Sequence, residues 1–141
     1  MHDLDKSGPE NVCRELVIAF QGVLSWKWDS QLETALAEFS IVDNNDRIRA
    51  IVERYLSSTW NSSNIGKASK VVQMIANNLG GLRSGQMLFI SDPNQDVLIC
   101  GVWWPWGDGK TISFRVAPYK KSVSESEMAE IIALFKGWFG L

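Results

Sequence analysis

The sequence contains very little of the side-chain chemistry on which most enzymes depend. Its 141 residues include one histidine, His2, at a terminus that we expect to be frayed. Ser-His-Asp and Cys-His mechanisms need a histidine held inside the fold, so both are disfavoured. The same scarcity disfavours every metal site except one built from carboxylates alone. We therefore expect no catalytic residues, no cofactor and no metal, and we expect that the protein is not an enzyme.

Cysteine is scarce as well. The two cysteines, Cys13 and Cys100, are too few and too isolated for a disulfide framework or a zinc site. Each lies inside an apolar pattern, which predicts a small buried hydrophobe. The chain also lacks any apolar run of about 18 residues and a basic N-terminal segment followed by an apolar one. These absences predict a cytoplasmic protein with no membrane-spanning segment and no secretory signal.

One motif comes close to a known binding site and fails. The segment 107–111 ends in Gly-Lys-Thr, as a phosphate-binding loop does. That loop also needs a glycine five positions before Gly109, where this chain has Trp104, and a helix after the lysine. From Thr111 onward apolar and polar residues alternate, which predicts a strand instead. No nucleotide site is expected.

What is present is typical of a folded globular chain. The hydrophobic fraction is 45% and the charged fraction is 21%, both ordinary values for such proteins. The length lies in the usual range of one domain. We predict a single α+β domain over residues 1–141, with residues 1–8 flexible.

Helical periodicity dominates the first half of the chain. Apolar residues recur at helical spacing in four segments, which predict helices over about 7–26, 30–39, 48–56 and 65–79. Ser30 and Glu33 have the spacing of a capping box at the start of the second helix, and Asp43 precedes the third. The polar segment 57–64 predicts a loop, and Gly80 with its neighbouring glycine predicts the end of the fourth helix.

The second half changes to a strand-like pattern. Residues 86–91, 97–104 and 111–119 are predicted strands, joined by turns at 92–96 and 105–110. A last helix is predicted to begin near Ser124. Because sequential strands usually pair, we predict a three-stranded antiparallel meander with the C-terminal helix packed on one sheet face, alongside the four N-terminal helices.

Tryptophan is the unusual feature, because the chain has seven of them. Trp103 and Trp104 are adjacent on a predicted strand, so they point to opposite faces and one of them can enter the core. Trp106 lies in the hairpin loop, and Trp26 and Trp28 flank a lysine at a predicted helix end. Aromatic side chains are enriched at interface centres. These five are candidates for partner binding; folding back onto the edge of the core is the plainer alternative.

Charge is unevenly distributed, although the net charge is only −2. Residues 1–46 hold nine acidic and three basic residues, whereas residues 47–91 hold six basic residues and one acidic residue. One interpretation is an acidic surface that meets a basic partner. The other is that the two regions pair with each other, or that the charges cover helix surfaces. Asp29 and Asp108 complete the set of partner-binding candidates.

These observations favour a non-enzymatic protein-binding domain. The specific hypothesis is a bacterial immunity protein that neutralises a cognate toxin by occluding its active site, with tryptophan anchors and acidic residues that match a basic groove. The alternative is a secretion-type chaperone for an effector protein, which should show a pronounced hydrophobic surface and a dimer. A small enzyme is disfavoured, and so is a nucleic-acid-binding domain, because few basic residues accompany the aromatic ones. We expect no nucleic-acid or membrane partner, and either a monomer or a homodimer.

Overall fold

The computed structural model describes residues 7–41 and 45–141. Helices and strands are interspersed through both halves of the chain. In chain order the elements are α1 (Ser7–Ala19), β1 (Lys27–Asp29), β2 (Thr34–Ser40), α2 (Asn45–Tyr55), β3 (Ser58–Asn61), the 3-10 helix η1 (Ile65–Lys67), α3 (Lys70–Asn78), β4 (Met87–Ile90), β5 (Val97–Pro105), β6 (Thr111–Lys120) and α4 (Glu125–Trp138). The α+β class that the sequence predicts is therefore confirmed.

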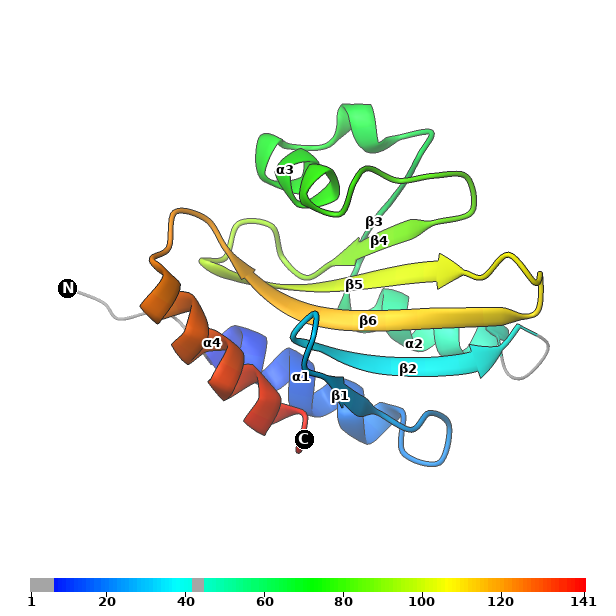
Figure 1. Ribbon diagram of the computed structural model, residues 1–141, viewed down its shortest axis with the longest axis horizontal. Coiled ribbons are helices and arrows are strands. Elements are labelled where there is room, and N and C mark those ends of the chain that lie inside the picture. Colours follow the sequence, from blue (N-terminus) through cyan, green and yellow to red (C-terminus); the bar gives the residue numbers. More distant parts are fainter. Residues whose placement is uncertain (1–6, 42–44) are drawn as a thin grey trace.

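The six strands of the described residues form one antiparallel sheet with the order β1-β2-β6-β5-β4-β3 (Figure 1). The neighbours β4, β5 and β6 are the three predicted strands. β2 pairs with β6, with Ala37 opposite Phe114, so the first third of the chain lies beside the last strand. β3 pairs with β4 at the far edge. The prediction of a three-stranded meander is wrong, because these strands form only the inner part of a larger sheet.

The main error of the sequence-based prediction concerns residues 30–39, which do not form a helix. Residues 34–40 form β2 instead, and three consecutive residues of it, Ala35, Leu36 and Ala37, are buried. Strand side chains alternate between faces, so the buried side chains of this run point to both faces of the sheet. A short apolar run looks the same in a buried strand and in a buried turn of helix, and periodicity alone does not separate the two.

The predicted loop over residues 57–64 is also wrong in part. Its residues Ser58–Asn61 form β3, an edge strand whose four residues are all half-buried. An edge strand pairs through its backbone on one side only, so polar side chains are compatible with it. The segment 65–79, predicted as one helix, is divided into η1 and α3.

One face of the sheet, called the closed face below, is covered by α1, α2 and α4. Its core contains Phe20 just after α1, Phe114 from β6 and Phe135 from α4, each without exposed surface. Trp103 from β5 also belongs to this core, and its ring lies edge-on to that of Phe89 at a centroid distance of 6.1 Å. Interlocked aromatic rings of this kind make the closed face a fully packed helix-on-sheet layer.

The opposite face, called the open face below, is covered only in part. α3 packs over β4 and β5, where Val72 and Ile75 cluster with Leu88, Ile90 and Leu98. Figure 1 shows α3 on one side of the sheet and α1, α2 and α4 on the other; within the described ranges no helix lies over β1, β2 and β6 on the α3 side. Helices lie on both faces because β5 is apolar at successive positions, so both of its faces need cover.

Other predicted boundaries are confirmed. α4 follows Ser124, whose hydroxyl accepts a hydrogen bond of 3.1 Å from the Glu127 backbone N–H, as an N-cap should. α3 is followed by Gly80 and Gly81, which both have a φ of +85°, a conformation that glycine adopts without strain. α1 begins at Ser7 as predicted but ends at Ala19, well before Trp26.

Two predictions concern residues outside the described ranges. The flexibility predicted for residues 1–8 concerns mainly residues 1–6, which lie outside the described ranges, whereas Ser7 and Gly8 belong to α1. Asp43, which was predicted to precede a helix, also lies outside the described ranges. Among the described residues no helix is long and apolar enough to span a bilayer.

Candidate functional site

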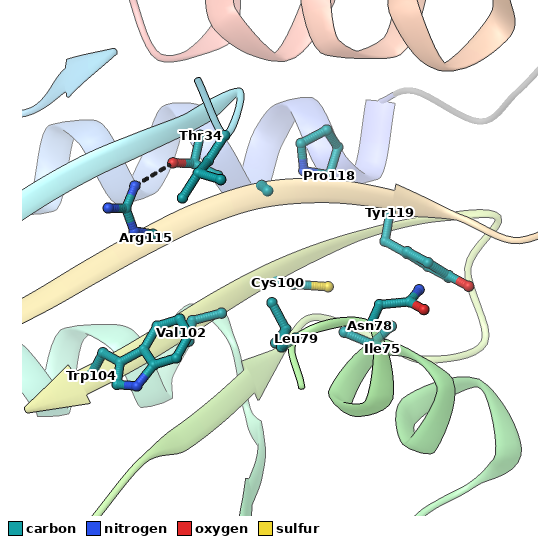
Figure 2. Close-up of a pocket in the computed structure, with 12 residues that line it drawn as sticks. Thr34, Ile75, Asn78, Leu79, Cys100, Val102, Trp104, Arg115, Pro118 and Tyr119 are labelled. Atoms are coloured by element: carbon teal, nitrogen blue, oxygen red, sulfur yellow. Dashed lines mark hydrogen bonds between the residues drawn. The ribbon is translucent and has the colours of Figure 1, made fainter. Parts of the chain in front are cut away.

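The open face carries a groove between α3 and the turn that joins β1 to β2. One hollow of this groove has a volume of about 240 Å³. The wall on one side is α3, the wall on the other is the β1–β2 turn, and the floor is formed by β5 and β6. The side chains that matter most are apolar or aromatic: Leu32, Ile75, Leu79, Val102, Trp104 and Tyr119. Figure 2 shows Trp104 and Tyr119 at opposite ends of this hollow, with Ile75 of α3 and Leu79, the residue after α3, on one side of it.

A second hollow of about 280 Å³ continues the groove toward the β5–β6 hairpin. It shares Leu32, Trp104 and Arg115 with the first hollow and adds Trp106 and Ser113. The two hollows together are called the open-face groove below. Because they share three lining residues, they lie next to each other over β5 and β6.

The β1–β2 turn is held rigidly against the groove by Asp29. The carboxylate Oδ1 of Asp29 accepts hydrogen bonds from the backbone N–H groups of Gln31 at 3.0 Å and Leu32 at 3.2 Å. Glu33 then takes a φ of +56°, which is uncommon for a residue other than glycine. This geometry leaves the Leu32 side chain 58% exposed at the rim of the groove. A short side-chain cap therefore fixes the position of an exposed leucine.

Arg115 links this turn to the sheet. Its Nη1 donates to Asp29 Oδ2 at 2.6 Å and to Thr34 Oγ1 at 3.1 Å. The hydrogen bond from Arg115 is the main cause that lowers the pKa of Asp29, and the one from the Leu32 backbone N–H is the next. Asp29 is therefore ionised at neutral pH, with one oxygen bound to the turn and the other to Arg115. Figure 2 shows the Arg115–Thr34 hydrogen bond on the Trp104 side of the groove.

Trp106 is attached to the surface of β6 by its indole N–H. Its Nε1 donates to Ser113 Oγ at 2.6 Å, and that hydroxyl donates in turn to Glu38 Oε2 at 3.4 Å. Lys27 Nζ lies 3.3 Å from Glu38 Oε1. Trp106 nevertheless remains 46% exposed. The polar tip of the indole is satisfied, and its apolar ring is left facing solvent beside the groove.

The structure separates the five candidate tryptophans into two groups. Trp103 is buried in the closed face, and Trp26 packs there against Phe20, Phe114 and Phe139. Trp28 lies on the same side, with its ring 6.1 Å from that of Phe135 and 5.3 Å from Lys136 Nζ. Trp104 and Trp106 lie on the open face instead, together with Asp29. Two of the seven candidate residues, Trp104 and Trp106, therefore line the open-face groove, and a third, Asp29, is hydrogen-bonded to the groove residue Arg115.

Asp108, the remaining candidate, shapes the β5–β6 hairpin. Its Oδ1 accepts from the backbone N–H groups of Lys110 at 2.8 Å and Thr111 at 3.0 Å, and its Oδ2 accepts from the Thr111 hydroxyl at 2.9 Å. These bonds, first of all that from Lys110, lower the pKa of the carboxyl group. Gly109 has a φ of +68° at the turn. The Gly-Lys-Thr sequence is therefore part of a hairpin, and Asp108 orders the loop that carries Trp106.

The acidic residues of the first third lie on both sides of the sheet. Glu10 on α1 belongs to the closed-face layer, where its Oε2 lies 2.8 Å from Arg14 Nε. Asp29 and Glu38 belong to the open face and are each paired with a base, Asp29 with Arg115 and Glu38 with Lys27. The acidic residues of this segment that the structure describes therefore do not all lie on a single face of the sheet.

Sequence reasoning missed several groove residues. Leu32 was assigned to a helix, so its exposure in a turn was not expected, and Ile75 and Leu79 carried no signal beyond helix packing. Arg115 is different, because the clean alternation of residues 111–119 predicts it on the wetter face of its strand, together with Ser113. That alternation was the one available indication of a polar cluster near Trp106.

Cys100 lies on the floor of the groove and is 6% exposed. Burial raises the pKa of its thiol to about 12, so the thiol is protonated at neutral pH and is a poor nucleophile. Among the described residues there is no cluster of three or more side chains suited to bind a metal.

Comparison of the chain with protein-family models, with curated proteins and with solved structures finds no significant match. The function therefore has to be argued from the groove. What the groove offers is apolar and aromatic contact area around one well-held guanidinium, an arrangement suited to binding.

Proposed function

We propose that this chain is a non-enzymatic protein-binding domain that holds its partner against the open-face groove. The observation that carries the proposal is the position of its exposed apolar side chains. Leu32 and Trp106 are 58% and 46% exposed, and both line the groove whose floor contains Trp104. Three other large apolar side chains, Ile18, Ile41 and Met74, are exposed away from the groove, so Leu32 and Trp106 are the two that lie beside a depression, as apolar side chains of an interaction site do.

Both exposed side chains are positioned before a partner arrives. Asp29 fixes the turn that carries Leu32, and Ser113 fixes the indole of Trp106. Asp108 orders the hairpin behind Trp106. A surface that is already ordered loses less conformational entropy on binding, which favours affinity. This rigidity supports recognition of one cognate partner over adaptable binding of many.

Within this class, the finer proposal is a bacterial immunity protein. Its partner is a toxin domain whose active site would be covered by the surface around Trp104 and Trp106. Two exposed acidic residues support this, since Glu33 follows the groove residue Leu32 in the β1–β2 turn and Asp108 lies two residues after Trp106 in the β5–β6 hairpin, and both could pair with basic residues around a toxin active site.

A secretion-type chaperone is the second candidate, and the adjacency of the two hollows favours it. Two neighbouring hollows over β5 and β6 suit an extended segment of an effector. The chaperone hypothesis expects a homodimer in solution, whereas occlusion of a toxin expects a one-to-one complex. Mass measurement by light scattering separates the two.

The test is binding to the product of the neighbouring gene. We expect a stable complex whose affinity falls at least about tenfold for Trp104→Ala and for Trp106→Ala, as for central aromatic anchors. Ile18→Ala is the matched control, because Ile18 is 64% exposed on α1, on the other side of the sheet. Calorimetric titration gives the affinities, and circular dichroism verifies the fold of each variant.

Two results would contradict these proposals. Equal affinities for wild type and both tryptophan variants would remove the groove as the binding site. Failure of the protein to protect cells that express the neighbouring gene would remove the immunity hypothesis, whatever the affinity.

A further inference from the structure

Arg115 uses only one of its three nitrogens. Both of its hydrogen bonds, to Asp29 and to Thr34, come from Nη1. Nε and Nη2 donate to no side chain or backbone group of the described residues. Neither nitrogen is fully buried, so both retain some contact with solvent. These two nitrogens form one edge of the planar guanidinium, and the Arg115 side chain lines both hollows of the groove.

That edge has the chemistry of a carboxylate site. Nε–H and Nη2–H point the same way and bind the two oxygens of a carboxylate through parallel hydrogen bonds. The Arg115 side chain is only 22% exposed, and it lines both hollows among apolar side chains. A charged hydrogen bond is stronger in such surroundings than in open water. Asp29 does not occupy this edge, because its two oxygens are bound to the turn and to Nη1.

The shape of the groove distinguishes among carriers of a carboxylate. Arg115 lies where the two hollows meet, with Tyr119 and Leu79 lining the first and Trp106 lining the second. A chain terminus or a small free acid would fill one hollow and leave the other empty. A segment that passes through the groove fills both hollows, and it places an internal acidic side chain beside Arg115, where the two hollows meet.

We infer that the open-face groove binds an extended segment of a protein partner whose Asp or Glu side chain pairs with the Nε–Nη2 edge of Arg115, with one apolar side chain in each hollow. This inference rests on the proposed function, since it names the chemistry of the segment that the proposed site takes. Charge complementarity at Arg115 then sets the register of the segment, and the apolar contacts with Trp104 and Leu32 supply contact area.

The test uses random nine-residue peptides displayed inside a phage coat-protein loop, so that neither peptide end is free. We expect selection to enrich peptides with an acidic residue between two apolar ones, and expect their binding to be lost with Trp104→Ala. A selected peptide is then synthesised with both ends blocked, once with Glu and once with Gln at the acidic position. Wild type should bind the Glu form about tenfold more tightly.

Arg115→Lys is the discriminating variant. It keeps the positive charge beside Asp29 but loses the planar edge, so the preference for Glu over Gln should fall to about twofold or less, with the fold verified by circular dichroism. Two results would overturn the inference and leave the proposed function standing. One is that the peptides that need Trp104 show no preference for an acidic residue; the other is that the preference for Glu over Gln is unchanged in Arg115→Lys. If no enriched peptide depends on Trp104, both fail.

Discussion

The two faces of the sheet are built from the same strands and differ in how they are completed. On the closed face three helices cover the sheet, and most of the aromatic side chains that pack there are buried. On the open face α3 covers β4 and β5 only. β5 shows the difference within two residues: Trp103 is 4% exposed on the closed face, whereas Trp104 forms part of the groove floor on the open face.

This difference shows how a small domain can keep stability and recognition apart. The closed face supplies most of the large, fully buried side chains and therefore most of the hydrophobic stabilisation. The open face exposes apolar area that its own chain leaves uncovered. Because the sheet separates the closed face from the open face, we expect substitutions on the closed face to affect folding and substitutions on the open face to affect binding.

The largest expected effect separates the two adjacent tryptophans. Trp103→Ala should lower the free energy of unfolding by about 3–5 kcal/mol, as removal of a buried aromatic ring does. Trp104→Ala should lower it by about 1 kcal/mol, because its ring is only partly buried. Urea denaturation followed by circular dichroism measures both. Equal losses for the two variants would show that the open face contributes to the core as much as the closed face does.

A glycine on the closed face gives the next largest effect. A Cβ at Gly101 would lie 2.7 Å from the Phe114 ring and 3.0 Å from Leu56 Cδ1, so Gly101→Ala should destabilise the protein by about 1–3 kcal/mol through overpacking. Gly107→Ala is the control, because nothing lies within 4 Å of a Cβ there. Thermal melting of both variants tests the comparison. A neutral Gly101→Ala would mean that the closed face can yield to an extra methyl group.

The pair of Asp29 and Arg115 gives a pH-dependent effect on the open face. The pKa of Asp29 is lowered below its ordinary value of 3.8 in the folded protein, so its stabilising contribution is complete above pH about 4 and is lost as the pH falls through the folded pKa. Asp29→Asn keeps an oxygen that can accept from the turn but loses the charge. The stability difference between wild type and Asp29→Asn should be constant near neutral pH and shrink below pH about 4. Urea titrations at several pH values measure it, and a difference that grows on acidification would contradict the assignment.

The smallest effect on stability is expected at the rim of the groove. Leu32 is 58% exposed, so Leu32→Ser should change the free energy of unfolding by no more than about 0.5 kcal/mol. The same variant should weaken partner or peptide binding several-fold, because it removes apolar contact area from both hollows. Denaturation and calorimetric titration of one preparation give both quantities. A large loss of stability would place Leu32 in the core of the fold.

Elements with local signals were predicted well. The strands β5 and β6 and the Asp108 turn follow from alternation and turn residues, and α4 follows from its cap. β2 and β3 were not found, because their pairing partners, β6 and β4, lie far from them in sequence. A buried run such as Ala35, Leu36 and Ala37 becomes a strand only when β6 is available to pair with it.

The tryptophans show the same division between local pattern and tertiary structure. Strand alternation by itself determined that Trp103 and Trp104 point to opposite faces, and the turn chemistry of Asp108 and Gly109 determined that Trp106 lies at the end of a hairpin. Only the tertiary structure decided which of the two faces is covered. It placed α3 over half of the open face and set Leu32, Arg115 and Trp104 side by side. The physical reason is that side-chain direction is a local property of the backbone, whereas burial depends on which distant elements pack against it.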